Sequence, residues 1–330
     1  MDQINRNIQK LFEKQLLSKE QESSVRDYFS LGIFSLRNEL LFLLYFSVLL
    51  FTSGVGVLIY ENIDTIGHTL ILLIMFVLIA VCFFISFKKS NGFSKEDIDF
   101  DNPVFNYLVL LAVILSCSFM GYIQFQYLIF GDYYEISVLI SALIAIASAY
   151  YFNNKSALSI GITALATSIG ISVTPKSLLR NEVYWNENLS YYGLILGVLI
   201  VFWAIYSKKN HLKRHFDFVL LTFALHLVGM CCISGLYHDY WILFVLLLAG
   251  AAYYFYAMSF ELRAISIYIF TILYAFIGFN IFMARTLDEL NLFDDFETII
   301  VLLPVYFIAS IVLFIRAIKN FNKKTDDSLR

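Results

Sequence analysis

The sequence predicts an all-α, polytopic integral membrane protein with ten transmembrane helices, and three observations support this. First, 60% of the 330 residues are hydrophobic and only 15% are charged, whereas about 25% are charged in ordinary soluble chains. Second, apolar runs of about 20 residues, the length needed to cross a bilayer, recur along the chain. Third, the lysines and arginines between these runs alternate in number, as they do in multi-pass proteins.

Each apolar run is expected to be a helix rather than a strand. A helix satisfies all its backbone polar groups within the segment, which lipid requires, and the runs are too long and too evenly apolar for barrel strands. The run 156–173 is short and rich in Ser, Thr and Gly. The predicted spans are 40–60, 69–87, 107–130, 135–152, 156–173, 191–207, 217–236, 240–259, 264–284 and 297–316.

The distribution of positive charge predicts the orientation. If the N-terminus is cytoplasmic, twenty of the 23 lysines and arginines fall on that side, and only Lys176, Arg180 and Arg285 fall outside. The positive-inside rule therefore supports ten spans and predicts that both termini lie in the cytoplasm. No cleavable signal peptide is expected, because a charged segment of 39 residues precedes the first apolar run.

A sequence repeat suggests how the spans are grouped. The string AYYF occurs at 149–152 and at 252–255, and the spans that follow align at an offset of 108, with Thr163 opposite Thr271. This favours a parallel repeat of four helices plus four after an initial hairpin, although chance resemblance between apolar helices is an alternative. The expected parts are a cytoplasmic hairpin (1–39), a first transmembrane hairpin and loop (40–104), units A (105–210) and B (211–316), and a cytoplasmic tail (317–330).

The segment 1–39 is expected to form two short helices. Apolar residues from Ile4 to Leu16 recur at helical spacing, and 18-SKEQ-21 resembles a capping box that starts a second helix. The hairpin could fold back onto the membrane-side loops or dock a cytosolic protein. Its six basic and six acidic residues give no basic surface for nucleic acid.

Polar residues inside the spans are the candidate binding or cavity residues. Ser156, Ser159, Thr163, Thr167 and Gly170 share one helical face. This face could pack against the equivalent face of span 264–284 or line a solute path. His226 and Asn280 are isolated in their spans; His226 could bond to a neighbouring helix or contact a ligand.

Groups needed for several chemistries are missing from the spans. Almost no ionisable residue lies in their interiors, which argues against an ion-driven pump. No metal-binding or nucleophile motif is present, so the sequence indicates no catalytic residue, cofactor or metal, and an enzyme is not favoured. Glu61, Asn62 and Asp64, where the first span ends, could form a site or mark the helix exit, and we favour the exit.

The N-terminal region resembles a known group of proteins. The segments 16-LLSKEQ-21 and 51-FTSGVGVLIYENIDTIGH-68 are similar to those of bacterial predicted membrane proteins of unknown function, over about residues 10–70. In that group a Leu-Ile-Ser-x-x-Gln-like motif precedes a Gly-rich first span with a polar exit. Asn62 and Asp64 match the exit, whereas Ile63 stands where that group tends to have Trp. The resemblance implies a polytopic inner-membrane protein and no activity.

Two functions of different classes fit these observations. The leading hypothesis is a protein that binds or translocates a small neutral or lipophilic molecule through the repeat interface. The alternative is a structural or sensory envelope component that recruits a cytosolic partner through residues 1–39. A membrane-embedded enzyme that uses outer-face residues such as Glu61 and His68 ranks third.

Overall fold

The computed structural model of the chain is built from long helices. It describes residue 21 and residues 37–61, 67–90, 92–97, 102–173, 187–289 and 296–327. Within these residues there are ten helices long and apolar enough to cross a membrane, and no strand. The predicted fold class, an all-α protein with ten spans, is therefore confirmed.

The helices agree closely with the predicted spans. Helix α6 starts directly after Pro103, and α7 ends at Phe152, where the left-handed backbone of the next residue, Asn153 (φ 62°), stops the helix. The helices are α3 (Arg37–Glu61), α5 (His68–Lys89), α6 (Val104–Tyr127), α7 (Tyr134–Phe152), α8 (Lys155–Val173), α10 (Glu187–Lys209), α11 (Asp217–Gly235), α12 (Trp241–Glu261), α13 (Ile265–Glu289) and α14 (Phe296–Asp327), with a 3-10 turn η2 (Arg214–Phe216) before α11.

Helix α14 continues well beyond the predicted end of its span at residue 316. Phe321 is only 2% exposed, and its ring centroid lies 4.5 Å from that of Tyr268 and 4.8 Å from that of Phe260. The ammonium of Lys324 lies 5.7 Å from the Phe260 ring centroid. These contacts bury Phe321, a residue of the predicted tail, against α12 and α13. Such tertiary packing stabilises the helical conformation of the chain after residue 316.

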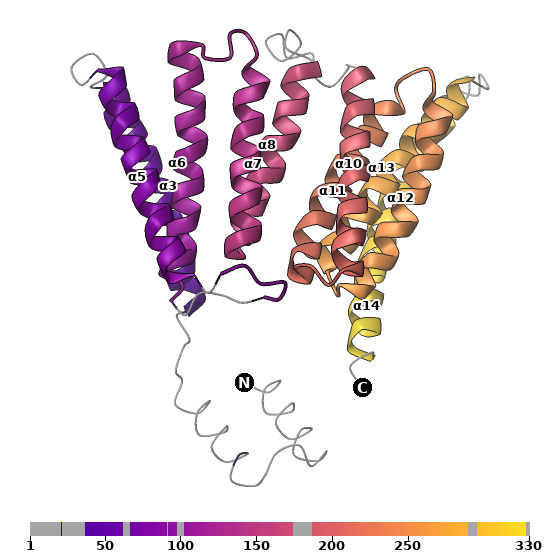
Figure 1. Cartoon of the computed structure of the whole chain (residues 1–330). Coiled ribbons are helices and arrows are strands. Elements are labelled where there is room, and N and C mark those ends of the chain that lie inside the picture. The colour runs from indigo at the N-terminus through magenta and orange to yellow at the C-terminus, as the bar shows by residue number, and fades with distance from the viewer. Residues whose placement is uncertain are drawn as a thin grey trace. The chain divides into compact units, whose positions relative to one another are not determined.

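The chain divides into two compact units, residues 1–57 and 58–330. In the first unit the structure describes Gln21 and the residues from Arg37 onward, so the predicted hairpin over 1–39 lies almost entirely outside the described residues and stays a prediction. In the second unit, α5, α6, α7 and α8 pack in sequence as antiparallel neighbours (Figure 1). Helices α11, α12 and α13 contact one another, and α10 packs mainly on α11.

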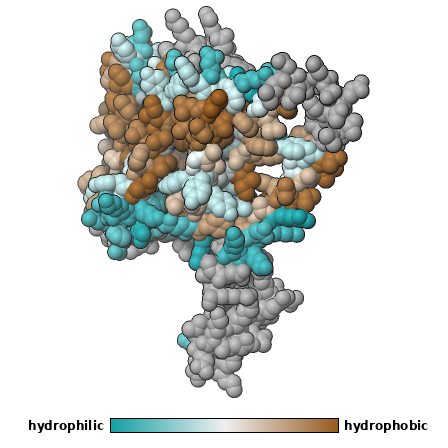
Figure 2. All heavy atoms as spheres, turned by 90° about the vertical axis from the view of Figure 1, so that its right-hand side faces the viewer, coloured by the Kyte–Doolittle hydropathy of each residue, from teal (hydrophilic) through white to brown (hydrophobic). Residues whose placement is uncertain are grey.

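The surface of the second unit is that of a membrane protein. On the face that carries α12 and α14, Figure 2 shows a broad hydrophobic zone between hydrophilic zones at the helix ends. Large apolar side chains such as Leu246, Tyr253 and Leu313 are more than 60% exposed along these helices. Lipid is the medium in which such a surface is stable.

Several turns meet on the side predicted to be cytoplasmic. The backbone N–H of Lys213 donates to the carbonyl oxygen of Lys95 at 2.8 Å. The Asn153 amide donates to Asp97 at 2.8 Å. Lys208 and Glu261 form an ion pair. The segments 92–97, 153–155 and 208–216 are thereby tied together on one face of the second unit.

Candidate functional site

The buried face of α8 packs against α7. A Cβ placed on Gly161 would lie 2.6 Å from Cγ1 of Ile146, so the two helices approach closely there. The hydroxyl of Ser168 donates to the carbonyl oxygen of Glu135 at 2.8 Å. Small residues permit this approach, as is usual between helices in lipid. The buried residues of α8 are Ala157, Leu158, Gly161, Ile162 and Ser168.

The threonine face of α8 points away from this packing. Thr163 and Thr167 are exposed, and no atom lies within 4 Å of a Cβ placed on Gly170. The expected packing of this face against span 264–284 is therefore wrong, because α8 contacts mainly α7 and α10, whereas the main partners of α13 are α11, α12 and α14. The 4+4 duplication itself stays a prediction.

A pocket of about 450 Å³ lies between α8, α10 and α11. It brings together Thr163 and Thr167 from α8 and His226 from α11, three of the residues singled out in the sequence. Most other lining side chains are apolar. The lining includes Thr163, Thr167, Ile169, Gly170, Ser190, Gly193, Leu196, His226, Met230, Cys231 and Ser234.

Three of the hydroxyl groups in this pocket donate to groups of the protein. Thr163 Oγ1 donates to the carbonyl oxygen of Ser159, and Thr167 Oγ1 to that of Thr163, both at 2.8 Å. At the far end of α10 and α11, Ser190 donates to the hydroxyl of Ser234 at 2.9 Å. The protons of both α8 threonines are thus used within the helix, and their oxygens keep lone pairs that can accept a hydrogen bond.

His226 is fixed by α13. Its Nδ1 lies 2.9 Å from the hydroxyl oxygen of Tyr274, and its ring meets that of Phe270 edge-to-face, with centroids 4.6 Å apart. This is the bond to a neighbouring helix expected for a histidine inside a span. The same residue also lines the pocket.

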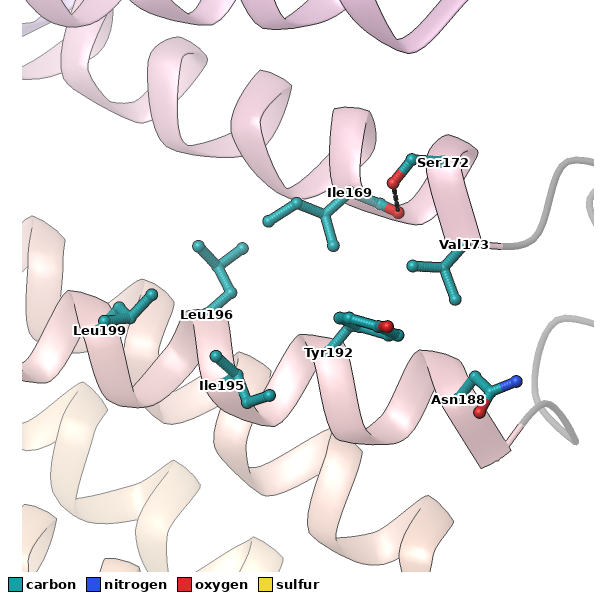
Figure 3. Close-up of a pocket in the computed structure, with 8 residues that line it drawn as sticks. All are labelled: Ile169, Ser172, Val173, Asn188, Tyr192, Ile195, Leu196 and Leu199. Atoms are coloured by element: carbon teal, nitrogen blue, oxygen red, sulfur yellow. Dashed lines mark hydrogen bonds between the residues drawn. The ribbon is translucent and has the colours of Figure 1, made fainter.

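A second pocket of about 520 Å³ lies between α8 and α10 (Figure 3). Ile169 and Leu196 line both pockets, and Figure 3 shows these two side chains pointing toward each other across the helix pair. Tyr192 and Val173 face each other near the helix ends, where Ser172 donates to the Ile169 carbonyl at 2.9 Å. The two pockets therefore share these two apolar lining residues.

The wall formed by α10 was not found from the sequence. Ser190, Gly193 and Gly197 follow one another at spacings of three and four, the same signal that drew attention to α8. A Cβ on Gly193 would lie 2.5 Å from Cys231 Sγ, and one on Gly197 would lie 2.7 Å from Val228 Cγ2. These small residues bring α10 onto α11 and so shape one side of the pocket.

The other sequence candidates do not line this pocket. The Tyr306 hydroxyl donates to Asn280 Oδ1 at 2.8 Å, which joins α13 to α14. Glu61 is the last residue of α3, its side chain is outside the described part of the chain, and so are Asn62 and Asp64. Among described residues, no three His, Cys, Asp or Glu side chains come together as a metal site would require.

Comparison with known proteins supports the resemblance found at the N-terminus. Residues 9–158 match the model of a family described as "Predicted membrane protein (DUF2157)". This region runs through α7 and ends near the start of α8, so all residues that line the 450 Å³ pocket lie beyond it. Comparison with curated proteins and with solved structures finds no match. Over residues 9–158, the chain is similar to the predicted membrane proteins of this family, whose function is unknown.

Proposed function

We propose that this membrane protein binds or moves a small, neutral, lipophilic molecule in the pocket between α8, α10 and α11. One observation carries the proposal. Thr163, Thr167 and His226, polar residues from two separate spans, line one cavity of about 450 Å³. Pockets of roughly 300–1,000 Å³ with apolar walls and a few polar groups are typical of small-molecule sites.

The lining residues favour an uncharged ligand. His226 and Cys231 are the two ionisable residues in the lining, and no Asp, Glu, Lys or Arg lines the pocket. An ionic ligand would therefore lose its hydration without gaining a counter-charge, which is costly in an apolar site. A neutral molecule with an apolar body pays much less.

The ligand is expected to enter from the hydrocarbon phase. Thr163, Thr167 and Met230 line the pocket and are exposed on membrane-spanning helices, with Met230 54% exposed. Lipid therefore borders the pocket at these residues. A lipophilic molecule dissolved in the bilayer could reach the site without crossing a polar surface.

Photolabelling would test the binding. The full-length protein in lipid nanodiscs is irradiated with a small, uncharged aryl diazirine, and labelled residues are mapped by mass spectrometry. We expect labels on α8, α10 and α11 around Thr163, Gly170 and His226. Labelling there should saturate as the probe concentration rises, whereas labelling of lipid-facing helix surfaces should remain linear.

A matched pair of glycines supplies the control. Gly170 lines the pocket and Gly250 does not, and no atom lies within 4 Å of a Cβ placed on either. Gly170→Phe should fill the pocket and abolish saturable labelling, and Gly250→Phe should leave it intact. Equal labelling of both variants, or labelling that never saturates in the native protein, would refute the proposal.

We also propose that the protein lies in a bacterial inner membrane with both termini in the cytoplasm. Support comes from the twenty basic residues predicted on that side and from the gathering of turns 92–97, 153–155 and 208–216 on one face. Single cysteines introduced at Lys209 and Lys323, in a background without the native cysteines, should react with an impermeant thiol reagent only after the cells are opened. Reaction of either one in intact cells would contradict this orientation.

A further inference from the structure

We infer that the ligand of this pocket carries a hydroxyl group, as in a lipophilic alcohol or phenol, and that the threonines of α8 accept a hydrogen bond from it. The inference rests on the proposed function and gives the chemical class of the molecule bound.

The two threonines offer acceptors and no donor. A threonine hydroxyl has one proton and two lone pairs. In α8 the proton of Thr163 is donated to the Ser159 carbonyl oxygen and that of Thr167 to the Thr163 carbonyl oxygen, each at 2.8 Å. Such bonds to the carbonyl four residues earlier are common for threonine in helices. Both side chains line the pocket, and each oxygen keeps lone pairs but no further proton to donate.

A ligand with a donor matches these oxygens, and one without a donor does not. A hydroxyl can donate to the Thr163 or Thr167 oxygen, whereas an ether or ketone of the same shape brings only acceptors. Acceptor facing acceptor is unfavourable, and in an apolar site water does not readily replace the missing donor. The α8 threonines therefore select for O–H over C=O or C–O–C.

His226 is compatible with the same group. Its Nδ1 is occupied by the Tyr274 hydroxyl, 2.9 Å away. The other ring nitrogen is a donor or an acceptor according to the tautomer. A hydroxyl fits both cases, because it accepts as well as donates. An amine would be charged at neutral pH and would lack a counter-ion in this lining.

A pair of ligands that differ in one hydrogen-bond donor tests the inference. 4-Butylphenol and 4-butylanisole compete with the aryl diazirine for pocket labelling in nanodiscs, with both concentrations expressed per mole of lipid. One net hydrogen bond corresponds to a preference of about three- to tenfold. We expect the phenol to compete better by this factor in the native protein.

Threonine variants assign the preference to α8. Thr163→Val combined with Thr167→Val removes both acceptors at nearly constant volume and should bring the two competitors to equal potency. Thr222 makes the same kind of bond, to Phe218 at 2.7 Å, but does not line the pocket. Thr222→Val should therefore keep the preference of the native protein. Thermal unfolding of each variant checks that it is folded.

The outcomes separate this inference from the proposed function. If phenol and anisole compete equally well in the native protein, the pocket binds lipophiles but the hydroxyl preference is wrong. A preference that survives the double substitution would also overturn the role of the threonines. If neither molecule displaces a saturable label that Gly170→Phe abolishes, the hydroxyl inference is wrong while the proposed binding in the pocket stands. If no saturable label exists, the proposed function fails as well.

Discussion

The ammonium group of Lys213 donates a hydrogen bond to Asn153 Oδ1 at 2.9 Å. Lys213 is only 1% exposed, and the Asn153 amide in turn donates to Asp97 at 2.8 Å. The three residues come from the α5–α6 connection, the turn between α7 and α8, and the turn before η2. This chain of polar contacts links helices on both sides of the α8–α10 pair that borders the pockets.

Asn153 should be sensitive to the kind of residue that replaces it. Its φ of 62° lies in the left-handed region, which costs a residue with a Cβ about 1–2 kcal/mol and costs glycine little. Asn153→Ala and Asn153→Gly both lose the bonds to Lys213 and Asp97, worth about 1 kcal/mol each. We expect Ala to be less stable than Gly by about 1 kcal/mol, measured by thermal unfolding in detergent. Equal losses would show that backbone strain at this turn is unimportant.

The stability that depends on Lys213 should change with pH. Burial lowers the pKa of Lys213 below its ordinary value of 10.5, and the Asp97 carboxylate offsets this only in part. Between the lowered pKa and 10.5, the unfolded chain binds more protons than the folded one, so stability rises with pH in this window. Below this window Lys213 is protonated in both the folded and the unfolded chain, so the cost of burying its charge no longer changes with pH.

Lys213→Met isolates this effect. The difference in Tm between the native protein and the variant should shift in favour of the native protein as pH rises toward 10.5. Groups common to both proteins cancel in that difference. If the plots of Tm against pH for the native protein and the variant stay parallel over the whole pH range, Lys213 titrates alike in the folded and unfolded chains.

Gly161 should not tolerate a methyl group. A Cβ there would lie 2.6 Å from Ile146 Cγ1 and 3.0 Å from the Ile146 backbone nitrogen, which cannot rotate away. We expect Gly161→Ala to lose about 1–3 kcal/mol of stability. Gly170→Ala, on the same helix with no atom within 4 Å of the added Cβ, should change stability by less than about 0.5 kcal/mol. The pair is compared by unfolding in the same detergent.

The contact between His226 and Tyr274 should be measurable as a coupling energy. Hydrogen bonds between membrane helices contribute about 0.6 kcal/mol on average and up to about 1.7 kcal/mol. A double-mutant cycle with His226→Leu and Tyr274→Phe, followed by unfolding, should give a coupling in this range. A coupling near zero would show that the 2.9 Å approach does not hold α11 to α13.

Much of the molecule follows from the sequence because lipid imposes simple rules. A helix must be apolar for about 20 residues to span the membrane, and this requirement located all ten spanning helices among the described residues, although α14 continues to Asp327, well past its predicted end at residue 316. Polar side chains are costly in lipid, so Thr163, Thr167 and His226 were conspicuous. That they share a cavity could not be read from the sequence, since they lie in different spans.

The tertiary structure decided which helices are neighbours. In lipid every apolar face is equally well solvated, so hydrophobicity does not choose a partner; close fit does. Gly161 lets α8 approach α7 closely at Ile146. Gly193 and Gly197 likewise let α10 approach α11. This left the threonine face of α8 open beside α10 instead of packed on α13. The sequence by itself determined the spans and their polar residues, and packing alone determined the pocket.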